Sequence, residues 1–257
     1  MSVRNSLLLA FAVLAAAGTG ASAQQAGQPA RADAAPKAVL ELFTSQGCSS
    51  CPAADALFVE LARDPELVTL TFPVTYWDYL GWKDTLGQDG FTKRQKRYAK
   101  ARGDGQVYTP QAIVNGGGHI VGSDRKALDA AVHEQAARGF PVSIRPAREG
   151  GTLTLSLSPG SDPAALAPAG VWMLALSRSV TVPIERGENS GKTVTYTNVV
   201  RGMTRIGDWT GEAAVLTVAL ETVRRPEADA YVVLVQSDQP RPGGGPVLGA
   251  TRSAALP

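Results

Sequence analysis

The feature that most constrains the fold is the pair Cys48 and Cys51, which stands between a strand-like run and a helical pattern. The run before it, Ala38–Phe43, is almost continuously apolar and of strand length, which is typical of a strand covered on both faces. The segment after it has apolar residues at helical spacing, namely Ala54, Leu57, Phe58 and Leu61. The sequence therefore predicts a strand, a short polar loop that carries both thiols, and a helix.

The spacing of the two cysteines indicates redox chemistry. Residues three apart lie on one side of the first helical turn, so Cys48 and Cys51 can close a small disulfide. The free amides and the dipole of a helix N-terminus stabilise a thiolate, so we expect a lowered pKa and a nucleophilic role for Cys48. Cys51 would then resolve a mixed disulfide between Cys48 and a substrate. Pro52 is compatible with this position, because the first helical turn does not need its missing N–H.

The same pair has other interpretations that the sequence leaves open. It could be an inert structural disulfide, two unrelated small core residues, or a two-thiolate site for a soft ion such as Cu(I). The chain has only two Cys and two His, which excludes a disulfide-rich scaffold, a four-thiolate zinc or iron–sulfur site and a three-histidine centre. We predict no metal site and no organic cofactor, because a cysteine pair is itself a redox carrier.

The N-terminus has the pattern of a secretory signal peptide over residues 1–23. Arg4 gives a basic start, Leu7–Ala17 is apolar, and Ala21–Ala23 is a small-residue end. The apolar run is about half of the roughly 20 residues that a spanning helix needs, although an uncleaved N-terminal anchor is the alternative. We expect a flexible lead-in over residues 24–36 and an exported protein, periplasmic or secreted, without a membrane span after cleavage. Disulfides persist in such a compartment.

The rest of the chain divides into two patterns. Residues 37–139 alternate short apolar runs with helical patterns, which is typical of an α/β structure, with a helical insert at about residues 77–104. Residues 140–257 show period-two runs separated by Gly- and Pro-rich connections, which favour a β-rich, sandwich-like domain. These runs are Leu153–Leu157, Val171–Leu176, Val194–Val200, Ala214–Leu220 and Tyr231–Val235. The 25 basic and 23 acidic residues lack the excess of positive charge expected of a nucleic-acid binder or a polybasic membrane protein.

Cys-x-x-Cys at a helix start, followed much later by Thr109-Pro110 before a strand hairpin, resembles the thioredoxin superfamily. The resemblance implies an α/β thioredoxin-like domain, a mixed sheet flanked by helices, over residues 37–139. In that superfamily a cis-proline faces the dithiol and the residue before it offers backbone hydrogen bonds to a bound substrate chain. The resemblance therefore implies a cis bond at Pro110 and substrate contacts at Thr109.

A narrower resemblance rests on the strings LELFTSQGCSSCPAAD, YWDYLGWKD, YTPQAIVNG and RGENSGKTVTYTNVVR. They are similar to an exported bacterial group within the superfamily, known as domain of unknown function 1223, from about residue 38 to the C-terminus. The group does not supply a substrate. Two departures from the better-known thioredoxins are Gly47, where tryptophan often precedes the first cysteine, and the uncharged pair Ser49 and Ser50, which does not assign a redox potential.

Further candidates for the site lie near the dithiol in sequence or by resemblance. Glu41 interrupts an apolar strand, where a carboxylate is costly unless it is paired or protonated. It could shuttle a proton to or from Cys51 with a raised pKa, or it could form an ion pair or hydrogen bond with a neighbouring strand. The aromatic stretch that contains Trp77 could wall the dithiol or simply pack. We count Trp77 and Tyr108 with Thr109 as substrate-binding candidates.

These observations predict an exported thiol–disulfide oxidoreductase-like protein. Cys48 and Cys51 exchange disulfides, Pro110 positions the partner, and Glu41 is the candidate acid. The partners would be protein thiols or disulfides, or an external redox partner, and not nucleic acid. The alternatives are a non-catalytic binding module with a structural disulfide and a protein that handles Cu(I).

Overall fold

The structure is a computed structural model that describes residues 35–160, 168–240 and 243–256. The predicted signal peptide and most of the predicted lead-in lie outside the described residues. Among the described residues no helix is long and apolar enough to cross a membrane.

The first half of the chain alternates strands and helices, as its sequence pattern predicts. A single 3₁₀ turn, Asp78–Leu80, and then α2 lie within the predicted helical insert. The elements are β1 (Ala38–Thr44), α1 (Cys51–Leu61), β2 (Leu67–Pro73), α2 (Asp89–Arg102), β3 (Gln111–Val114), β4 (His119–Val121) and α3 (Arg125–Arg138).

The second half consists mainly of strands, several of them long. The predicted period-two runs fall on these strands, so the strand predictions are confirmed. The elements are β5 (Val142–Glu149), β6 (Thr152–Pro159), β7 (Ala169–Pro183), β8 (Thr193–Trp209), β9 (Ala214–Ala219), α4 (Leu220–Val223), β10 (Ala230–Ser237), β11 (Val247–Ala250) and β12 (Ala254–Ala255).

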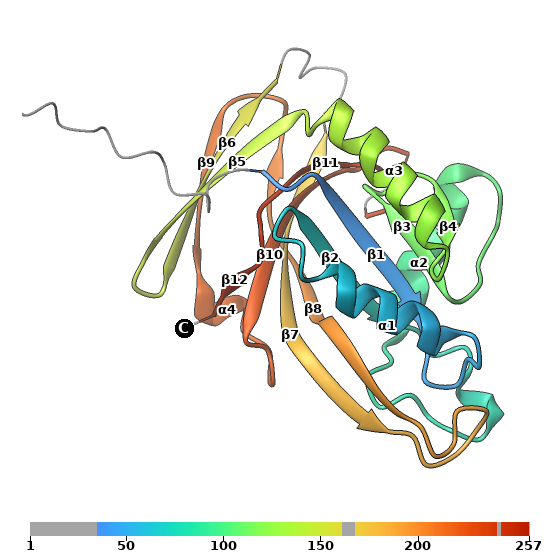
Figure 1. The fold of residues 1–257 in the computed structure, drawn as a ribbon. Helices are drawn as coiled ribbons and strands as arrows, with labels where there is room; N and C mark the ends of the chain where they lie inside the picture. The colour runs from blue at the N-terminus through green and yellow to red at the C-terminus, as the bar shows by residue number, and fades with distance from the viewer. Residues whose placement is uncertain (1–34, 161–167, 241–242, 257) are drawn as a thin grey trace, which may run out of the picture. The chain divides into compact units, whose positions relative to one another are not determined.

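The expected fold class, a helix-flanked thioredoxin-like domain followed by a sandwich-like region, is wrong. One nine-stranded mixed sheet dominates the described chain, with the order β11-β10-β7-β8-β2-β1-β3-β4 and with β12 paired to β10 (Figure 1). β8 lies parallel to β2 through the pair Thr71 and Val199, so strands of the second half continue the sheet of the first. The sequence did not predict this strand pairing, because an alternating pattern indicates that a segment is a strand but not which strand lies beside it.

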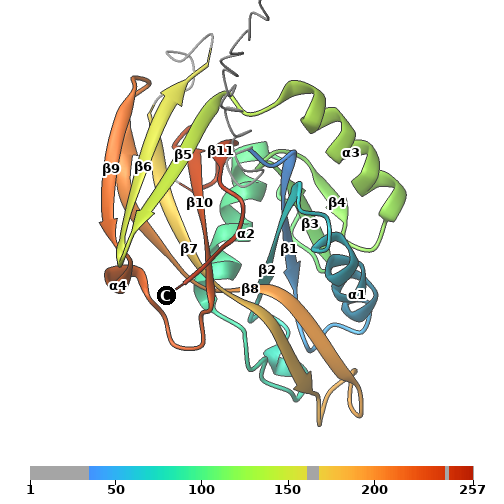
Figure 2. The ribbon, with the colours of Figure 1, turned by 60° about the vertical axis from the view of Figure 1, so that its left-hand side comes forward.

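Helices cover both faces of the sheet around β1, and its side chains divide between them (Figures 1 and 2). All seven residues of β1 are buried. Leu40 and Leu42 pack in the cluster that contains α1 and α3, whereas Val39 and Phe43 pack in the cluster that contains α2. Even-numbered side chains of β1 therefore point toward α1, and odd-numbered ones point toward α2, as strand geometry requires.

A second sheet of three antiparallel strands, in the order β5-β6-β9, covers β7 and β10. Its inward residues Leu153, Leu155 and Leu157 join a cluster with Val171 and Met173 of β7. Buried side chains therefore extend from α1, through the large sheet, to β9.

Both ends of α3 carry residues that favour a helix boundary. The Asp124 side chain caps the helix by accepting a hydrogen bond from Ala127 N at 3.0 Å. The helix ends at Arg138, and Gly139 follows it with a positive φ of 65°. An aspartate before the helix and a glycine after it are the usual chemical signals for these ends.

Candidate functional site

A disulfide joins Cys48 and Cys51 at the junction of β1 and α1, with Cα atoms 5.4 Å apart. The helix begins at Cys51, and Pro52 occupies its first turn, where no backbone N–H is required. Cys48 is 3% exposed and Cys51 is fully buried. Cys48 is thus slightly the more exposed residue of the pair.

The two residues inside the disulfide loop are exposed, unlike the cysteines themselves. The Ser50 hydroxyl lies 3.4 Å from Cys48 Sγ. Cys51 N donates a hydrogen bond to the Cys48 carbonyl at 3.1 Å. A hydroxyl at this position can donate to a thiolate on Cys48 when the disulfide is reduced.

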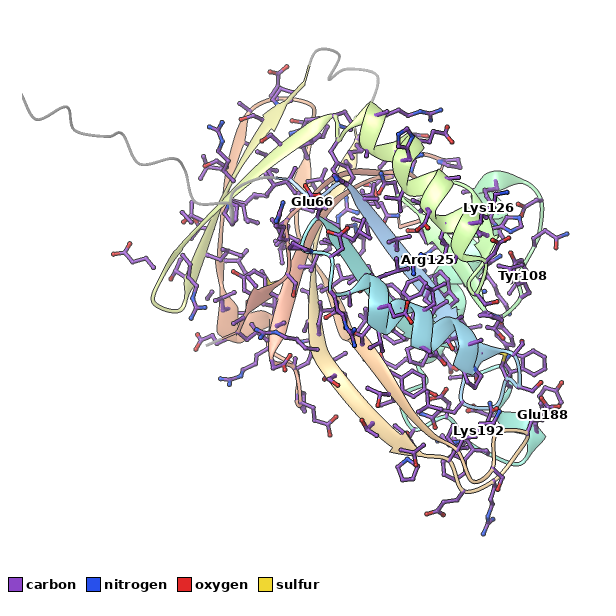
Figure 3. The ribbon with its side chains drawn as sticks, in the orientation of Figure 1. Glu66, Tyr108, Arg125, Lys126, Glu188 and Lys192 are labelled. Atoms are coloured by element: carbon purple, nitrogen blue, oxygen red, sulfur yellow. A yellow bond between two sulfur atoms is a disulfide. The ribbon has the colours of Figure 1, made fainter. Side chains whose placement is uncertain are left out.

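The loop between β7 and β8 lies about 140 residues later in the sequence, and it forms hydrogen bonds with the cysteine loop (Figure 3). Asn189 is 1% exposed, and its Nδ2 donates to the carbonyl oxygens of Gln46 at 2.9 Å and Cys48 at 2.8 Å. Lys192 Nζ donates to Asn189 Oδ1 at 2.8 Å, which orients the amide. Glu188 accepts a hydrogen bond from Ser49 N at 3.3 Å.

Gln46 ties the same loop to the segment after β2. Its backbone N–H donates to Asp84 Oδ2 at 2.8 Å, and its side-chain Oε1 accepts from Trp82 Nε1 at 2.8 Å. Asp84 is 3% exposed, and burial raises its pKa above the ordinary value, although the backbone N–H groups of Gln46 and Leu86 oppose the rise. Polar contacts thus fix the backbone that leads into Cys48.

Trp77 connects the cysteine loop with the Thr109–Pro110 segment. A Cβ on Gly47 would lie 3.1 Å from Trp77 Cβ and 3.2 Å from the Trp77 carbonyl oxygen, so the two residues are in close contact. The indole Nε1 of Trp77 donates to Thr109 Oγ1 at 2.7 Å. Trp77 fills the space beside position 47, which explains why the residue before Cys48 is glycine.

The Thr109–Pro110 peptide bond is cis, as the resemblance implied. Pro110 is buried and approaches the first turns of α1. A Cβ on Gly122 would lie 3.2 Å from both Ala54 Cβ and Pro110 Cβ, so Pro110 and the first turn of α1 both lie beside Gly122. Thr109 remains partly exposed beside the buried proline. Contacts thus connect Gly47, the residue before Cys48, through Trp77 to Thr109, which directly precedes Pro110.

Tyr108 adjoins this group, but its side chain is engaged elsewhere. Its hydroxyl lies 2.8 Å from His119 Nδ1, and its carbonyl oxygen accepts a hydrogen bond from Gln95 Nε2 at 2.7 Å. Burial raises the pKa of Tyr108 above its usual value. These contacts support the course of the segment before Thr109.

Glu41 lies on the opposite side of β1 from α1 and forms a buried ion pair. Arg94 of α2 donates from Nε and Nη2 to the two carboxylate oxygens at 2.6 and 2.7 Å. Tyr98 donates to Glu41 Oε1 at 2.6 Å, and Gln236 Oε1 accepts from Arg94 Nη1 at 3.0 Å. Of the two expectations for Glu41, the structure supports the ion pair, because its odd-numbered position points the side chain toward α2 and away from Cys51.

Asp55 is an acid that the sequence reasoning missed. It lies four residues after Cys51 on the buried stripe of α1, and it is 2% exposed. Neither of its carboxyl oxygens nor the Thr44 hydroxyl has a partner at hydrogen-bond geometry. Burial raises the pKa of Asp55 to about 8, with Thr44 opposing the shift and the Asp84 carboxyl adding to it.

A signal for Asp55 was present in the sequence. Residues three, four and seven positions apart share one face of a helix, and Cys51, Ala54, Asp55 and Phe58 have this spacing. An acid within the stripe that faces the core is rare unless it has a partner or a function.

Among the described residues there is no group of three or more His, Cys, Asp and Glu that could hold a metal ion. The Cys48–Cys51 sulfurs are bonded to each other in this structure.

The fold and the site define a protein with one large mixed sheet and a disulfide at the start of a helix. The chain belongs to the family described as protein of unknown function (DUF1223), whose model matches residues 39–236. No curated protein matched the chain.

Two solved structures are similar to the chain. Protein AGR_C_4864 from Agrobacterium tumefaciens is 29% identical, with a TM-score of 0.71, and the match covers 87% of this chain and 95% of that one. HBP35 of Porphyromonas gingivalis is 12% identical, with a TM-score of 0.59, and the match covers 86% of this chain and 76% of that one. The second likeness concerns the fold alone.

Proposed function

We propose that this protein is an exported thiol–disulfide exchange protein that works through Cys48 and Cys51. The observation that carries the proposal is the carboxyl of Asp55, which is buried one helical turn from Cys51 and forms no ion pair with any described residue. A buried acid without a cationic partner costs stability, and a disulfide that only braces the chain has no use for one. Perturbed buried acids of this kind are concentrated at functional sites.

The exchange has two steps that balance in electrons. In the reduced protein the Cys48 thiolate attacks a disulfide of the partner, forms a mixed disulfide and releases one partner thiolate, which takes a proton from solvent. The Cys51 thiolate then attacks Cys48 Sγ, closes the internal disulfide and releases the second partner thiolate. The partner gains two electrons and the protein loses two, and the reverse sequence oxidises a partner dithiol.

Asp55 is the proposed acceptor of the Cys51 proton. Side chains at positions i and i+4 of a helix have Cβ atoms about 5–6 Å apart, so transfer can occur directly or through one water. With a pKa of about 8, the carboxyl can take up and return a proton near neutral pH. Glu41 has no such role, because Arg94 and Tyr98 occupy its carboxylate on the other side of the sheet.

The partner chain would meet the disulfide at the surface formed by Thr109 and Trp77. Thr109 is partly exposed, and its hydroxyl is oriented by the Trp77 indole. Tyr79 is 75% exposed and stacks on Trp77, with ring centroids 6.3 Å apart. Exposed aromatic rings beside a reactive group can bind the apolar side chains of a polypeptide.

The motifs support the same chemistry and the same compartment. The resemblance of Cys-x-x-Cys and Thr-Pro to the thioredoxin superfamily implies dithiol exchange, and it carries no claim about the fold here. The N-terminal pattern of residues 1–23 implies export to a compartment where disulfides persist.

The test is the reduction potential and exchange rate of the protein that begins after the expected cleavage site. Equilibration with glutathione buffers gives the potential, and reduction of insulin disulfides gives the rate. We expect Cys48→Ser to abolish exchange and Cys51→Ser to accumulate a mixed disulfide through Cys48. A disulfide that dithiothreitol cannot reduce while the protein stays folded would overturn the proposal.

A matched pair of acid-to-amide variants separates the role of Asp55 from a general effect of charge removal. Asp55→Asn should slow the closing step by roughly 100- to 1,000-fold, in the lower part of the range for general acid–base catalysis, and flatten its pH profile. Glu41→Gln should lower stability and leave the shape of that profile unchanged.

A structural disulfide is the second candidate function, and the burial of both cysteines favours it. A disulfide that closes a four-residue loop stabilises a protein by about 2 kcal/mol through the unfolded state. In this case the double variant Cys48→Ser, Cys51→Ser would lose about that free energy of unfolding, and the wild-type protein would show no exchange with insulin.

A further inference from the structure

The outer face of α2 carries four positive charges in one stripe. Lys93, Lys96, Arg97 and Lys100 are all exposed. Their spacing of three, four and seven residues places them within an arc of about 100° and along about 10 Å of the helix axis. The stripe is concentrated charge in a chain that is otherwise slightly acidic. Of the 25 basic and 23 acidic residues, α2 holds six and one, which leaves 19 and 22 elsewhere.

The stripe is presented in a fixed orientation, because the opposite face of α2 is anchored in the core. Phe91 packs edge-on against Phe72, with ring centroids 5.2 Å apart. Arg94 and Tyr98 are buried in the polar network with Glu41. The helix therefore cannot rotate to bury the stripe or to spread its charges.

The described residues do not neutralise these charges. None of the four side chains forms an ion pair with any residue that the structure describes. The acids nearest in sequence are engaged elsewhere, since Asp89 accepts from the Thr75 hydroxyl at 2.6 Å and Asp104 pairs with Arg102 at 2.7 Å. Like charges at these helical spacings lower helix stability, so the stripe has no stabilising role of its own.

The chemistry of this face fits a diffuse anionic surface better than a folded acidic protein. Specific protein interfaces have an apolar core, whereas the exposed large hydrophobic side chains among the described residues are Tyr79, Val121 and Val215, none of them on α2. Three of the four cations are lysines, which act as hydrated point charges and do not require the planar acceptor geometry that arginine clamps prefer. A shallow hollow beside Lys96 and Lys100, bounded by Gly103, Gly105 and Val107, gives access to these ammonium groups.

We infer that α2 docks this protein on the phosphate headgroups of an anionic membrane surface through Lys93, Lys96, Arg97 and Lys100. The contact is electrostatic adsorption without insertion, because the stripe has no large apolar side chain. It is independent of the proposed disulfide exchange, which takes place at the β1–α1 junction.

The experiment is co-sedimentation of the chain from Gln24 onward with vesicles of phosphatidylcholine alone or mixed equally with phosphatidylglycerol. The protein should bind only the mixed vesicles, and the bound fraction should fall as salt is added, because salt screens charges at the surface. Each cation near an anionic surface contributes roughly a fivefold gain in binding. The variant with all four residues changed to Gln should therefore bind roughly several hundredfold more weakly.

A control variant removes the same number of charges elsewhere. Arg63, Lys83, Lys126 and Arg145 are exposed in different parts of the chain outside α2, and Lys126 is labelled on α3 in Figure 3. Changing these four to Gln should leave most of the binding intact. The stripe variant should also melt at the same or a higher temperature than the wild type, which shows that lost binding is not lost folding.

Three results would overturn the inference. They are no binding of the wild-type protein to phosphatidylglycerol vesicles, equal losses in the stripe and control variants, and binding to polyglutamate without binding to vesicles. The last result would assign the stripe to an acidic polypeptide instead. The same samples are also assayed for insulin reduction, so that a failure of membrane binding and a failure of the proposed disulfide exchange can be told apart.

Discussion

An acid can reach the two cysteines only if its side chain lies on the side of β1 that packs against α1. Glu41 and Thr44 differ by three positions, so their side chains point to opposite faces of the strand. Thr44 faces α1, where Asp55 lies, and Glu41 faces α2, where Arg94 lies. The sequence analysis singled out Glu41 and missed Asp55, because an apolar strand covered on both faces shows no alternation that would tell which face holds the helix of the two cysteines.

The raised pKa of Asp55 predicts a pH dependence of stability. The carboxyl has a pKa of about 8 when folded and an ordinary value of 3.8 when exposed, so the folded state binds more protons between these values. Unfolding then releases a proton, and the free energy of unfolding should fall as pH rises from about 4 to 8. The slope that Asp55 contributes approaches about 1.4 kcal/mol per pH unit.

Urea denaturation of the wild-type protein and Asp55→Asn across this pH range measures the effect. The free energy of unfolding of Asp55→Asn should depend less on pH, and the variant should be the more stable protein above pH 8. The comparison isolates Asp55 because the other titrating groups are common to both proteins. Parallel curves for the two proteins would show that Asp55 is ionised in the folded state at neutral pH.

At the scale of elements, two contacts that are distant in sequence shape the cysteine loop. Trp77 fills the space beside Gly47, and Asn189 on the β7–β8 hairpin holds the carbonyl groups of Gln46 and Cys48. The sequence predicted the Cys-x-x-Cys junction from the spacing of its residues, and the resemblance to the thioredoxin superfamily implied the cis bond at Pro110. It did not predict the hairpin contact, since the turn residues around Asn189 are equally well explained by backbone conformation alone.

Removal of the Asn189 amide should loosen the cysteine loop. Asn189→Ala leaves the buried Gln46 carbonyl without its donor, which costs about 1–3 kcal/mol, whereas the Cys48 carbonyl keeps its hydrogen bond from Cys51 N. The free energy of unfolding should fall, and dithiothreitol should reduce the Cys48–Cys51 disulfide severalfold faster. Urea denaturation and the rate of thiol release, followed with a thiol-specific dye, measure the two effects.

Ser190→Ala is the matched control for this hairpin. The Ser190 hydroxyl is exposed and donates to the Glu185 carbonyl at 2.8 Å within the same loop, without contact to the cysteine loop. It should leave the reduction rate unchanged. If Asn189→Ala and Ser190→Ala behaved alike, the hairpin would have no influence on the disulfide.

At the scale of the whole molecule, the seam between β2 and β8 joins the two halves of the chain. Thr71 Oγ1 donates to the Thr197 carbonyl at 2.6 Å, and Asn198 Nδ2 donates to Thr69 Oγ1 at 3.0 Å. The hydrophobic cluster beneath the seam includes Phe72 from the first half and Leu174 from the second. Strand patterns in the sequence predicted both halves but not this pairing, because one exposed backbone edge is chemically like another.

The shared cluster predicts that both halves unfold in one cooperative transition. The four tryptophans report on both sides of the seam, because Trp77 and Trp82 belong to the first half and Trp172 and Trp209 to the second. In a protein with Trp172→Phe and Trp209→Phe, fluorescence follows the first half alone, and the reciprocal variant follows the second. Within each variant the fluorescence midpoint in urea should coincide with the midpoint from far-ultraviolet circular dichroism, which averages over the chain.

Comparison within each variant removes the effect that the substitutions themselves have on stability. If residues 37–139 were an independent domain, fluorescence and circular dichroism would separate in both variants and in opposite directions, because each half would melt at its own urea concentration. Coincident midpoints with one slope would show that β8 is part of the structure that holds the dithiol in place. Loss of the Thr71 hydrogen bond in Thr71→Val should then lower both fluorescence midpoints together by an equal amount, since the seam belongs to both halves.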